Sequence, residues 1–326
     1  MGRVFEGEIK GLIFDIKKFA IHDGPGIRTT IFFKGCPLRC PWCHNPEGQS
    51  PERELWWWRS RCSGCGDCLG ACGEGALSLV DCSLSIDRER CTLCGACTEV
   101  CHREVLEIVG REVTVAQALE EIEKDIVFYD ASSGGVTLSG GEPLMQPEFL
   151  ATLLSACNER GIHTTVDTSG FAAPEVLARI RKDVDLFLYD LKLMDDELHQ
   201  RFTGASNELI LKNLRMLSRQ GHPVIVRIPI IPGVNDDENI LRIGRFVASL
   251  AKPYPIDLLP YHMAGVEKYA RLNREYRLPE ARPPTSERMA EPAETLISLG
   301  LEVTIGGEPY GNVRAGRALA RAEPQD

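Results

Sequence analysis

The chain has 326 residues, of which 43% are hydrophobic, so it can form one large domain or two modest domains around a substantial core. The formal net charge is −10 and no long basic stretch occurs, which argues against a nucleic-acid binder. No apolar run approaches the roughly 20 residues of a membrane span, and the charged start lacks the apolar region of a signal peptide, so we expect a cytoplasmic protein. Thirteen cysteines in such a protein predict metal binding rather than disulfides.

The segment 29–34 predicts a buried strand that leads directly into a cysteine motif. Cys36, Cys40 and Cys43 have the spacing C-x3-C-x2-C. Three thiolates this close together can hold three irons of a [4Fe-4S] cluster and leave the fourth iron open to a small molecule. A zinc site with His44 as fourth ligand is the alternative, although zinc motifs usually contain C-x2-C pairs.

Eight more cysteines form two copies of the spacing C-x2-C-x2-C-x3-C, which resembles that of the two-cluster bacterial ferredoxins. In those ferredoxins the fourth cysteine of each run binds the other cluster. The resemblance therefore implies one [4Fe-4S] cluster on Cys62, Cys65, Cys68 and Cys101, and a second one on Cys91, Cys94, Cys97 and Cys72. A pair of zinc ribbons or a disulfide knot is the alternative. We expect the ferredoxin-like segment to span residues 52–111.

Three adjacent tryptophans at 56–58 precede these runs. They predict packing of this segment onto the rest of the molecule, with an exposed contact surface as the alternative. Cys82 and Cys157 match neither run, and we interpret both as structural thiols, Cys157 on a helix.

Outside 52–111 the chain predicts alternating strands and helices. The expected strands are 136–139, 163–167, 186–191, 224–230, 256–260 and 301–305, and the expected helices are 113–128, 147–160, 174–181, 208–219 and 236–250. Such alternation predicts a parallel sheet, and six or more units suit a barrel or a partial barrel. Active sites in these folds gather at the carboxyl ends of the strands.

Polar motifs follow four of the expected strands: S-G-G-E-P at 139–143, D-T-S-G at 167–170, D-L-K at 190–192 and Y-H-M at 261–263. Each motif alone has a plain explanation as a turn, a cap, an ion pair or a loop. Together they would surround one mouth, where carboxylates suit an amino group or a sulfonium, and Lys192 and His262 suit a carboxylate.

The cysteine triad resembles that of the radical S-adenosylmethionine enzymes, and longer motifs resemble the glycyl-radical-enzyme activating enzymes of that family. These motifs are I-H-D-G-P-G-I-R-T-T at 21–30, F-K-G-C at 33–36, S-G-G-V-T-L-S-G-G-E-P-L at 133–144, H-T-T-V-D-T-S-G at 163–170, F-T-G at 202–204, V-R-I-P at 226–229 and L-P-Y-H at 259–262. The resemblance covers roughly residues 12–270. It implies an α/β fold, a partial (β/α)6 TIM-like barrel formed by residues 1–51 and 112–326, with the ferredoxin-like insert at 52–111.

The same resemblance implies that the triad cluster binds S-adenosyl-L-methionine. In this family an aromatic such as Trp42 lies beside the adenine, and the two glycines let the backbone approach the methionine amino group. A monovalent cation near Asp167, Thr168 and Asp190 is also implied, and the loop with Asp23 and Arg28 is expected to contact the incoming glycyl peptide. The implied cofactor contacts are Trp42, His44, Gly140, Gly141, Glu142, Asp167, Thr168, Asp190, Leu191, Lys192 and His262.

The implied reaction is reductive cleavage of S-adenosylmethionine to a 5'-deoxyadenosyl radical, which takes a hydrogen from a backbone glycine of a partner glycyl radical enzyme. A flavodoxin or ferredoxin would reduce the two insert clusters, which pass electrons to the triad cluster. Oxygen-sensitive clusters indicate an anaerobic cell. The insert is typical of activators of dehydratases, decarboxylases, C–S or C–N lyases and arylalkane-adding synthases, and it does not choose among them.

Two other classes of function stay open. An iron–sulfur electron-transfer protein would explain the cysteines but not the polar motifs at the strand ends. A radical enzyme that acts directly on a small molecule would explain both, and only the D-G-P-G-I-R loop at 23–28 argues against it.

Overall fold

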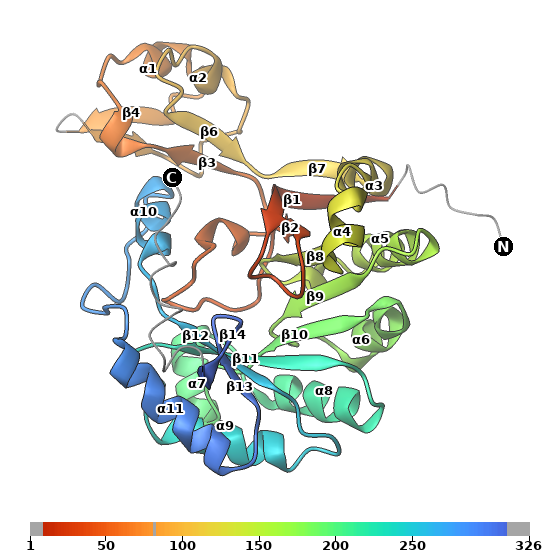
Figure 1. Ribbon diagram of the computed structural model, residues 1–326. Helices are drawn as coiled ribbons and strands as arrows, with labels where there is room; N and C mark the ends of the chain where they lie inside the picture. Colours follow the sequence, from red (N-terminus) through yellow and green to blue (C-terminus); the bar gives the residue numbers. More distant parts are fainter. Residues whose placement is uncertain (1–8, 81–82, 312–326) are drawn as a thin grey trace.

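The computed structural model describes residues 9–80 and 83–311. Its main feature is a ten-stranded sheet with the order β14-β13-β12-β11-β10-β9-β8-β2-β1-β7 (Figure 1). Neighbouring strands from β2 through β8 to β13 are parallel, whereas β1, β7 and β14 add to the two edges in antiparallel fashion. The strands are β1 (Lys10–Ala20), β2 (Arg28–Phe33), β7 (Arg111–Thr114), β8 (Gly135–Gly140), β9 (Thr164–Thr168), β10 (Leu186–Asp190), β11 (Val224–Ile230), β12 (Ile256–Pro260), β13 (Val303–Ile305) and β14 (Glu308–Pro309).

Helices cover one face of this sheet, and the sheet curves away from them (Figure 1). They are α3 (Val115–Glu123), α4 (Ile126–Ser132), α5 (Pro147–Glu159), α6 (Pro174–Ile180), α7 (Asp196–Thr203), α8 (Glu208–Arg219), α9 (Glu238–Ala248) and α11 (Ser286–Ser298). A further helix, α10 (Ala264–Arg271), lies instead beside the loop that follows β2, where a Cβ on Gly265 would touch the carbonyl oxygen of Cys43. The predicted α/β fold with a mostly parallel sheet is confirmed. Helix α8 and strands β11 and β12 have the predicted bounds, and most other predicted elements differ by one to three residues at an end.

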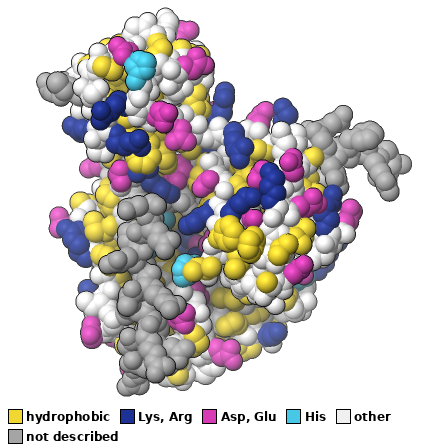
Figure 2. All heavy atoms as spheres, turned by 45° about the horizontal axis from the view of Figure 1, so that its top comes forward, with side chains coloured by type: hydrophobic (Ala, Val, Ile, Leu, Met, Phe, Trp, Pro, Cys, Tyr) yellow, Lys and Arg dark blue, Asp and Glu magenta, His cyan; other side chains and the backbone are white. Residues whose placement is uncertain are grey.

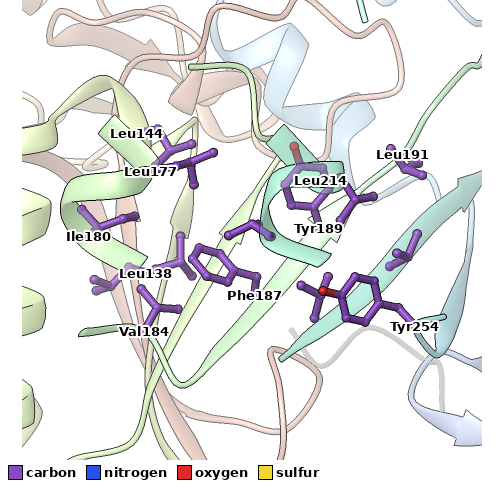
Figure 3. Close-up of a cluster of buried hydrophobic side chains, with 14 of the residues drawn as sticks. Leu138, Leu144, Leu177, Ile180, Val184, Phe187, Tyr189, Leu191, Leu214 and Tyr254 are labelled. Carbon is purple, nitrogen blue, oxygen red and sulfur yellow. The ribbon is translucent and has the colours of Figure 1, made fainter. Parts of the chain in front are cut away.

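The main core lies between the sheet and the helices. Figure 3 shows Phe187 of β10 beside Leu177 and Ile180 of α6, with Leu214 of α8 near Tyr189. Side chains alternate between the two faces of a strand, and in β11 alternate residues from Val224 to Ile230 are buried while those between them are half-buried. We call the side of the sheet away from the helices the inner face.

The predicted single helix over 113–128 is wrong. Val113 lies in β7, and the helix begins after Thr114, whose hydroxyl accepts from the amide of Gln117 while the Gln117 side chain accepts from the amide of Thr114. This capping box fixes the start of α3. The helix then stops before Asp125, whose buried carboxylate accepts from the Thr29 hydroxyl, and α4 begins anew. Apolar periodicity continues across both breaks, which is why it misled the prediction.

Residues 54–109 carry their own small elements at the top of Figure 1: β3 (Glu54–Trp57) pairs with β6 (Leu106–Val109), β4 (Leu77–Val80) with β5 (Ser83–Ile86), and α1 (Asp67–Ala71) and α2 (Ala96–Glu99) lie beside them. A second hydrophobic cluster is formed only by residues of this segment, including Leu55, Trp57 and Leu106. Trp56 faces the other way and packs with Leu272 and Phe14 of the main body. The prediction that the tryptophans pack this segment onto the body is confirmed for Trp56.

Two remaining cysteines and the membrane prediction can be checked briefly. Cys157 is fully buried on α5 in the main core, as predicted, and burial raises the pKa of its thiol to about 12. Cys82 lies outside the described residues. Within residues 9–80 and 83–311, no helix combines the length and the apolar character needed to cross a lipid bilayer.

Candidate functional site

The loop with the three cysteines lies across the carboxyl end of β8. The amide of Gly141 donates to the carbonyl of Phe33 (2.8 Å), and the amide of Glu142 donates to the carbonyl of Gly35 (2.7 Å). A Cβ on Gly141 would collide with the carbonyl oxygens of Gly35 and Gly48, which flank the cysteines. Glycine is therefore required here because the backbone at the strand end touches the backbone of the cysteine loop.

The three thiols come together in this loop. Burial raises the pKa of Cys40 to about 12, and nearby Lys192 opposes that rise; burial also raises the pKa of Cys36, where Cys40 and Cys43 are close enough to add to it. Iron binding would overcome these shifts, because a coordinating thiol is deprotonated outright. Three free thiols this close together form a donor set that a metal cluster can use.

Trp42 packs beneath the cysteine loop. It is buried together with Leu38 and Leu193, and its ring lies 6.0 Å from that of Phe202. The amide of Arg39 donates to the carbonyl of Thr203 (2.7 Å). The F-T-G motif at 202–204 thus supports the cysteine loop from below.

Glu142 is fully occupied by the protein. One carboxylate oxygen accepts from the Thr168 hydroxyl (2.6 Å) and the Leu144 amide (3.2 Å), and the other accepts from the amide (2.9 Å) and hydroxyl (2.5 Å) of Ser169. Burial raises the pKa of Glu142, and these four donors oppose the rise. The side chain ties the end of β8 to the end of β9, so its expected contact with the cofactor amino group is not the role that this geometry favours.

Four charged side chains meet on the inner face at the ends of β9, β10 and β11. Lys192 donates to Asp190 (2.8 Å), and Arg227 lies 3.3 Å from Asp167 and 4.0 Å from the other oxygen of Asp190. Burial raises the pKa of Asp167 to about 6, Arg227 opposes that rise and Asp190 adds to it. Burial alone would lower the pKa of Lys192, but Asp190 raises it above the usual value.

Arg227 lies where the sequence predicts a monovalent cation. Its guanidinium stands between Asp167 and Asp190 and supplies a positive charge there. The Thr168 hydroxyl is already used twice, as donor to Glu142 and as acceptor from the Gly170 amide (2.8 Å). This geometry gives no support to a cation between these residues.

His44 and His262 come together although 218 positions separate them. Their rings stack with centroids 3.6 Å apart. Burial lowers the pKa of His44 to about 3, with His262 contributing, and burial also lowers the pKa of His262. Both shifts disfavour the charged imidazole, and the Nε2 atom of His44 is buried without a hydrogen-bond partner within the described residues.

The predicted contacts thus fall into three groups. The first group consists of polar side chains that lie near the cysteine loop: Asp167, Asp190, Lys192, His44 and His262. A second group supports the cysteine loop from the protein side: Gly140, Gly141, Glu142, Thr168 and Trp42. The Leu191 side chain points into the main core (Figure 3), so only its backbone could reach a cofactor.

Arg227 is the site residue that the prediction missed. The V-R-I-P motif at 226–229 contains it, and alternation along β11 places residue 227 on the inner face, opposite the buried Val226 and Ile228. Its register partner on β10 is Asp190. The sequence could have indicated Arg227 as a site residue, because it is a charged residue on the inner face of a central strand.

Arg28 does not reach the surface, contrary to the expected peptide contact. Its guanidinium is fully buried and donates to Thr137 (2.6 Å) and to the carbonyls of Val136 (2.6 Å) and Pro25 (3.0 Å). Arg28 therefore holds the loop 21–27 against β8. Asp23 of the same loop accepts from the Thr30 hydroxyl on the inner face (2.7 Å).

The insert contains two cavities, each lined by four cysteines. One is lined by Cys72, Cys91, Cys94 and Cys97, and the other by Cys62, Cys65, Cys68 and Cys101. These are the two sets that a ferredoxin-like exchange of the fourth ligand requires. In the described chain no group of three or more His, Cys, Asp or Glu side chains is drawn close enough for a single metal ion. Each cavity is thus lined by the four cysteines that one [4Fe-4S] cluster takes as ligands.

Comparisons with known proteins agree with this geometry. The radical SAM superfamily domain matches residues 88–243, a span that begins after the cysteine triad. The chain is 45% identical to a trans-4-hydroxy-L-proline dehydratase activating enzyme of Clostridioides difficile, over 91% of this chain and 99% of that protein. It is 44% identical to a choline trimethylamine-lyase activating enzyme of Oleidesulfovibrio alaskensis (89% and 96%) and 43% identical to a benzylsuccinate synthase activating enzyme of Thauera aromatica (91% and 92%). The chain therefore belongs to the glycyl-radical-enzyme activating enzymes of the radical SAM superfamily.

Proposed function

We propose that this protein activates a partner glycyl radical enzyme by a radical S-adenosylmethionine reaction centred on Cys36, Cys40 and Cys43. The observation that carries the proposal is the meeting of this triad with polar groups that have spare bonding capacity. His44 Nε2 and Asp190 Oδ1 are buried without a hydrogen-bond partner in the part of the chain that the structure describes. A buried polar atom without a partner costs free energy, so a cofactor that bonds to these two atoms would use their free hydrogen-bonding capacity.

The residues at the mouth suit the parts of a zwitterionic cofactor. Asp190 suits its amino group or sulfonium, and Lys192 and Arg227 suit its carboxylate. The stacked pair of His44 and His262 offers a flat surface for the adenine, and Gly140 and Gly141 let the cysteine loop pack closely against the end of β8. When bound, the cluster and cofactor supply one electron and the radical that removes a hydrogen atom from the partner glycine.

The insert supplies the electrons in this proposal. Residues 52–111 form a ferredoxin-like domain with two [4Fe-4S] clusters in the two four-cysteine cavities, and residues 1–51 and 112–326 form the catalytic partial barrel. The protein then carries three clusters in all. A flavodoxin or ferredoxin is the reductant, because only a one-electron donor of low potential can feed such a chain.

The activity is tested with anaerobically reconstituted protein, dithionite and S-adenosylmethionine. Three partners are offered in turn: trans-4-hydroxy-L-proline dehydratase, choline trimethylamine-lyase and benzylsuccinate synthase. We expect deoxyadenosine release and a glycyl radical doublet in the EPR spectrum of one partner. Cys40→Ala should abolish both signals, whereas Cys157→Ala, at a buried cysteine outside the site, should keep both. Deoxyadenosine without a doublet on any partner would contradict the proposed activity.

The two insert clusters are tested by iron content. Cys65→Ala and Cys94→Ala each remove one ligand from a different cavity, and each should lower the bound iron by about one cluster's worth. Cys157→Ala is again the matched control and should keep its iron. Unchanged iron in either ligand variant would mean that its cavity holds no cluster.

A further inference from the structure

Two short segments expose an unusual share of the large apolar side chains. Nine such side chains are exposed among the described residues, and four of them come from the end of β1 with its following loop and from α4. These four, Phe19, Ile21, Val127 and Phe128, are called the apolar patch below. The rings of Phe19 and Phe128 meet edge to face, with centroids 4.7 Å apart. Figure 2 shows hydrophobic side chains gathered on one face of the body, below the insert.

Phe19 is held in a strained conformation although its side chain is 54% exposed. Its φ of 56° lies in the left-handed region, which is a costly conformation for a bulky residue. Burial of the Phe19 side chain within this chain therefore does little to offset the strain. The outlier belongs to an irregularity between Lys17 and Ala20 in the pairing of β1 with β2, and such bulges redirect a side chain at the edge of a sheet.

The apolar patch is mounted rigidly. The amide of Ile27 donates to the Ser132 hydroxyl (2.8 Å), which in turn donates to the carbonyl of Phe128 (2.7 Å). The loop and α4 are also in backbone contact, because a Cβ on Gly26 or Gly134 would collide with the opposite chain. A fixed apolar surface loses little conformational entropy when a partner binds to it.

The same loop forms part of the inner face. The carboxylate of Asp23 accepts from Thr30, and its carbonyl accepts from the Thr137 hydroxyl (2.6 Å). Asp23 is also close enough to interact electrostatically with Asp167 and Arg227 of the cofactor site. One side of the loop thus faces the site of chemistry, and its other side, two residues earlier at Ile21, belongs to the exposed apolar patch.

We propose that the apolar patch is the docking surface for the folded region of the partner glycyl radical enzyme that surrounds its glycine. This inference rests on the proposed function, since the partner's glycine has to reach the inner face. The patch is continuous with the loop that borders this face, and aromatic residues are enriched at the centre of protein interfaces. The charge beside the patch is mixed, because Lys18 is paired with Glu121 (3.5 Å) and Asp125 (3.7 Å) and Asp130 is exposed on α4, and this favours a protein over an anionic lipid surface.

The test uses reconstituted full-length protein and the partner that the wild type activates in the panel above. The variants are Val127→Glu, which adds a charge to the most exposed patch residue, and the double change Phe19→Ser with Phe128→Ser. Ile297→Ser on α11 is the control, at an apolar side chain that is exposed but distant in sequence. We expect both patch variants to raise the KM for the folded partner at least tenfold and to leave the maximal rate of glycyl radical formation within about twofold.

Two further measurements separate docking from chemistry. Deoxyadenosine release without a partner should be equal in all variants, and so should radical transfer to a short peptide that contains the glycine. If both patch variants keep the wild-type KM for the folded partner and release deoxyadenosine normally, the docking proposal is wrong and the proposed function is unaffected. A wild type that labels no panel partner overturns the activity, and the docking proposal with it. A patch variant that changes a wild-type dimer into a monomer would instead assign the patch to a second copy of this chain.

Discussion

At the scale of single residues, Glu142 and Asp190 show how differently two carboxylates at one mouth can be used. Glu142 accepts four hydrogen bonds from its own chain, whereas one oxygen of Asp190 accepts none from the residues described and has only Arg227 nearby, at 4.0 Å. A satisfied carboxylate supports the structure, and an unsatisfied one can take a ligand. The distinction concerns geometry, and the G-G-E-P and D-L-K motifs alone do not reveal it.

Glu142→Gln should destabilise the protein. Glutamine replaces one acceptor oxygen with an amide donor, which would face either the hydroxyl and amide of Ser169 or the donors on the other side. We expect the free energy of unfolding to fall by about 1–3 kcal/mol, measured by anaerobic urea denaturation. Glu148→Gln on α5 is the control, since Glu148 is largely exposed and has only a surface pair with Arg179. Equal losses in the two variants would show that the buried bonds of Glu142 contribute nothing specific.

Asp167 should give the protein a pH-dependent loss of stability. Burial raises its pKa from 3.8 to about 6 in the folded chain, so the folded state holds the proton more tightly than the unfolded state does. The stabilisation from that proton is complete below about pH 4 and disappears as the pH rises through about 6. Stability relative to Asp167→Asn should therefore fall between pH 4 and 6, measured by urea denaturation. Asp130→Asn, at an exposed position of α4, is the control. A constant difference between wild type and Asp167→Asn over this range would contradict the shift.

At the scale of elements, most strands and helices could be predicted because their apolar periodicity agrees with their tertiary role. Strand β11 alternates and α8 has an apolar stripe, and both have the predicted bounds. Helices α3 and α4 could not be separated, because the capping box at Thr114 and the buried Asp125 act against a continuing period. The antiparallel strand β1 was missed because residues 15–19 alternate only between exposed and half-buried side chains, two of them lysines.

The candidate site shows the same division. Cysteine spacing and strand-end position predicted the charged cluster, since parallel strands bring their carboxyl ends to one edge. The core position of Leu191 could have been predicted, because side chains alternate along a strand and Asp190 before it points to the inner face. The motif D-L-K was interpreted without this alternation, and Leu191 was wrongly included among the side chains of the site. The bonds of Glu142 to β9 depend on contacts between distant segments, which local patterns do not contain.

The two glycine-containing segments 24–26 and 133–135 pack against each other, backbone to backbone. Gly134→Ala should therefore have a severe effect on stability. Its Cβ would collide with the carbonyl oxygen of Ile27, where neither backbone can move without breaking the parallel pairing of β2 and β8. We expect a loss of at least about 3 kcal/mol in unfolding free energy, or insoluble protein. Gly311→Ala, where a Cβ would meet no atom of the described residues, should behave as wild type. A stable Gly134→Ala variant would show that the loop 21–27 is not held as described.

At the scale of the whole molecule, buried charges join the insert to the cysteine loop. Lys34, two residues before Cys36, is fully buried and lies 3.3 Å from Glu54 at the start of β3. Arg274 also pairs with Glu54 (2.5 Å), and Arg88, three residues before Cys91, reaches both Glu54 and the carbonyl of Leu272. Removal of one partner from a buried ion pair destabilises a protein far more than removal of one partner from a surface pair. This junction therefore fixes the distance between the insert and the triad.

The direction of the β3–β6 ribbon predicts which of the two proposed insert clusters would lie nearer to the triad. The ribbon leaves the body at Glu54, and the pair Leu55–Ile108 comes before the pair Trp57–Leu106. Leu55 and Ile108 line the cavity of Cys72, Cys91, Cys94 and Cys97, whereas Trp57 and Leu106 line the other cavity, about 7 Å further along the strands. Electrons should therefore enter at the cluster of Cys62, Cys65, Cys68 and Cys101 and leave through the one that contains Cys91.

This order can be measured by EPR on fully reduced protein, because dipolar coupling between clusters falls steeply with distance. Cys94→Ala removes a ligand of the nearer cluster and should narrow the spectrum and slow the relaxation of the triad cluster. Cys65→Ala removes a ligand of the farther cluster and should leave the coupling of the triad cluster close to that of the wild type. The two cysteines are a matched pair, since both are exposed and occupy equivalent places in the two runs. The opposite pattern would reverse the electron path, and equal effects would show that the ribbon does not set the order.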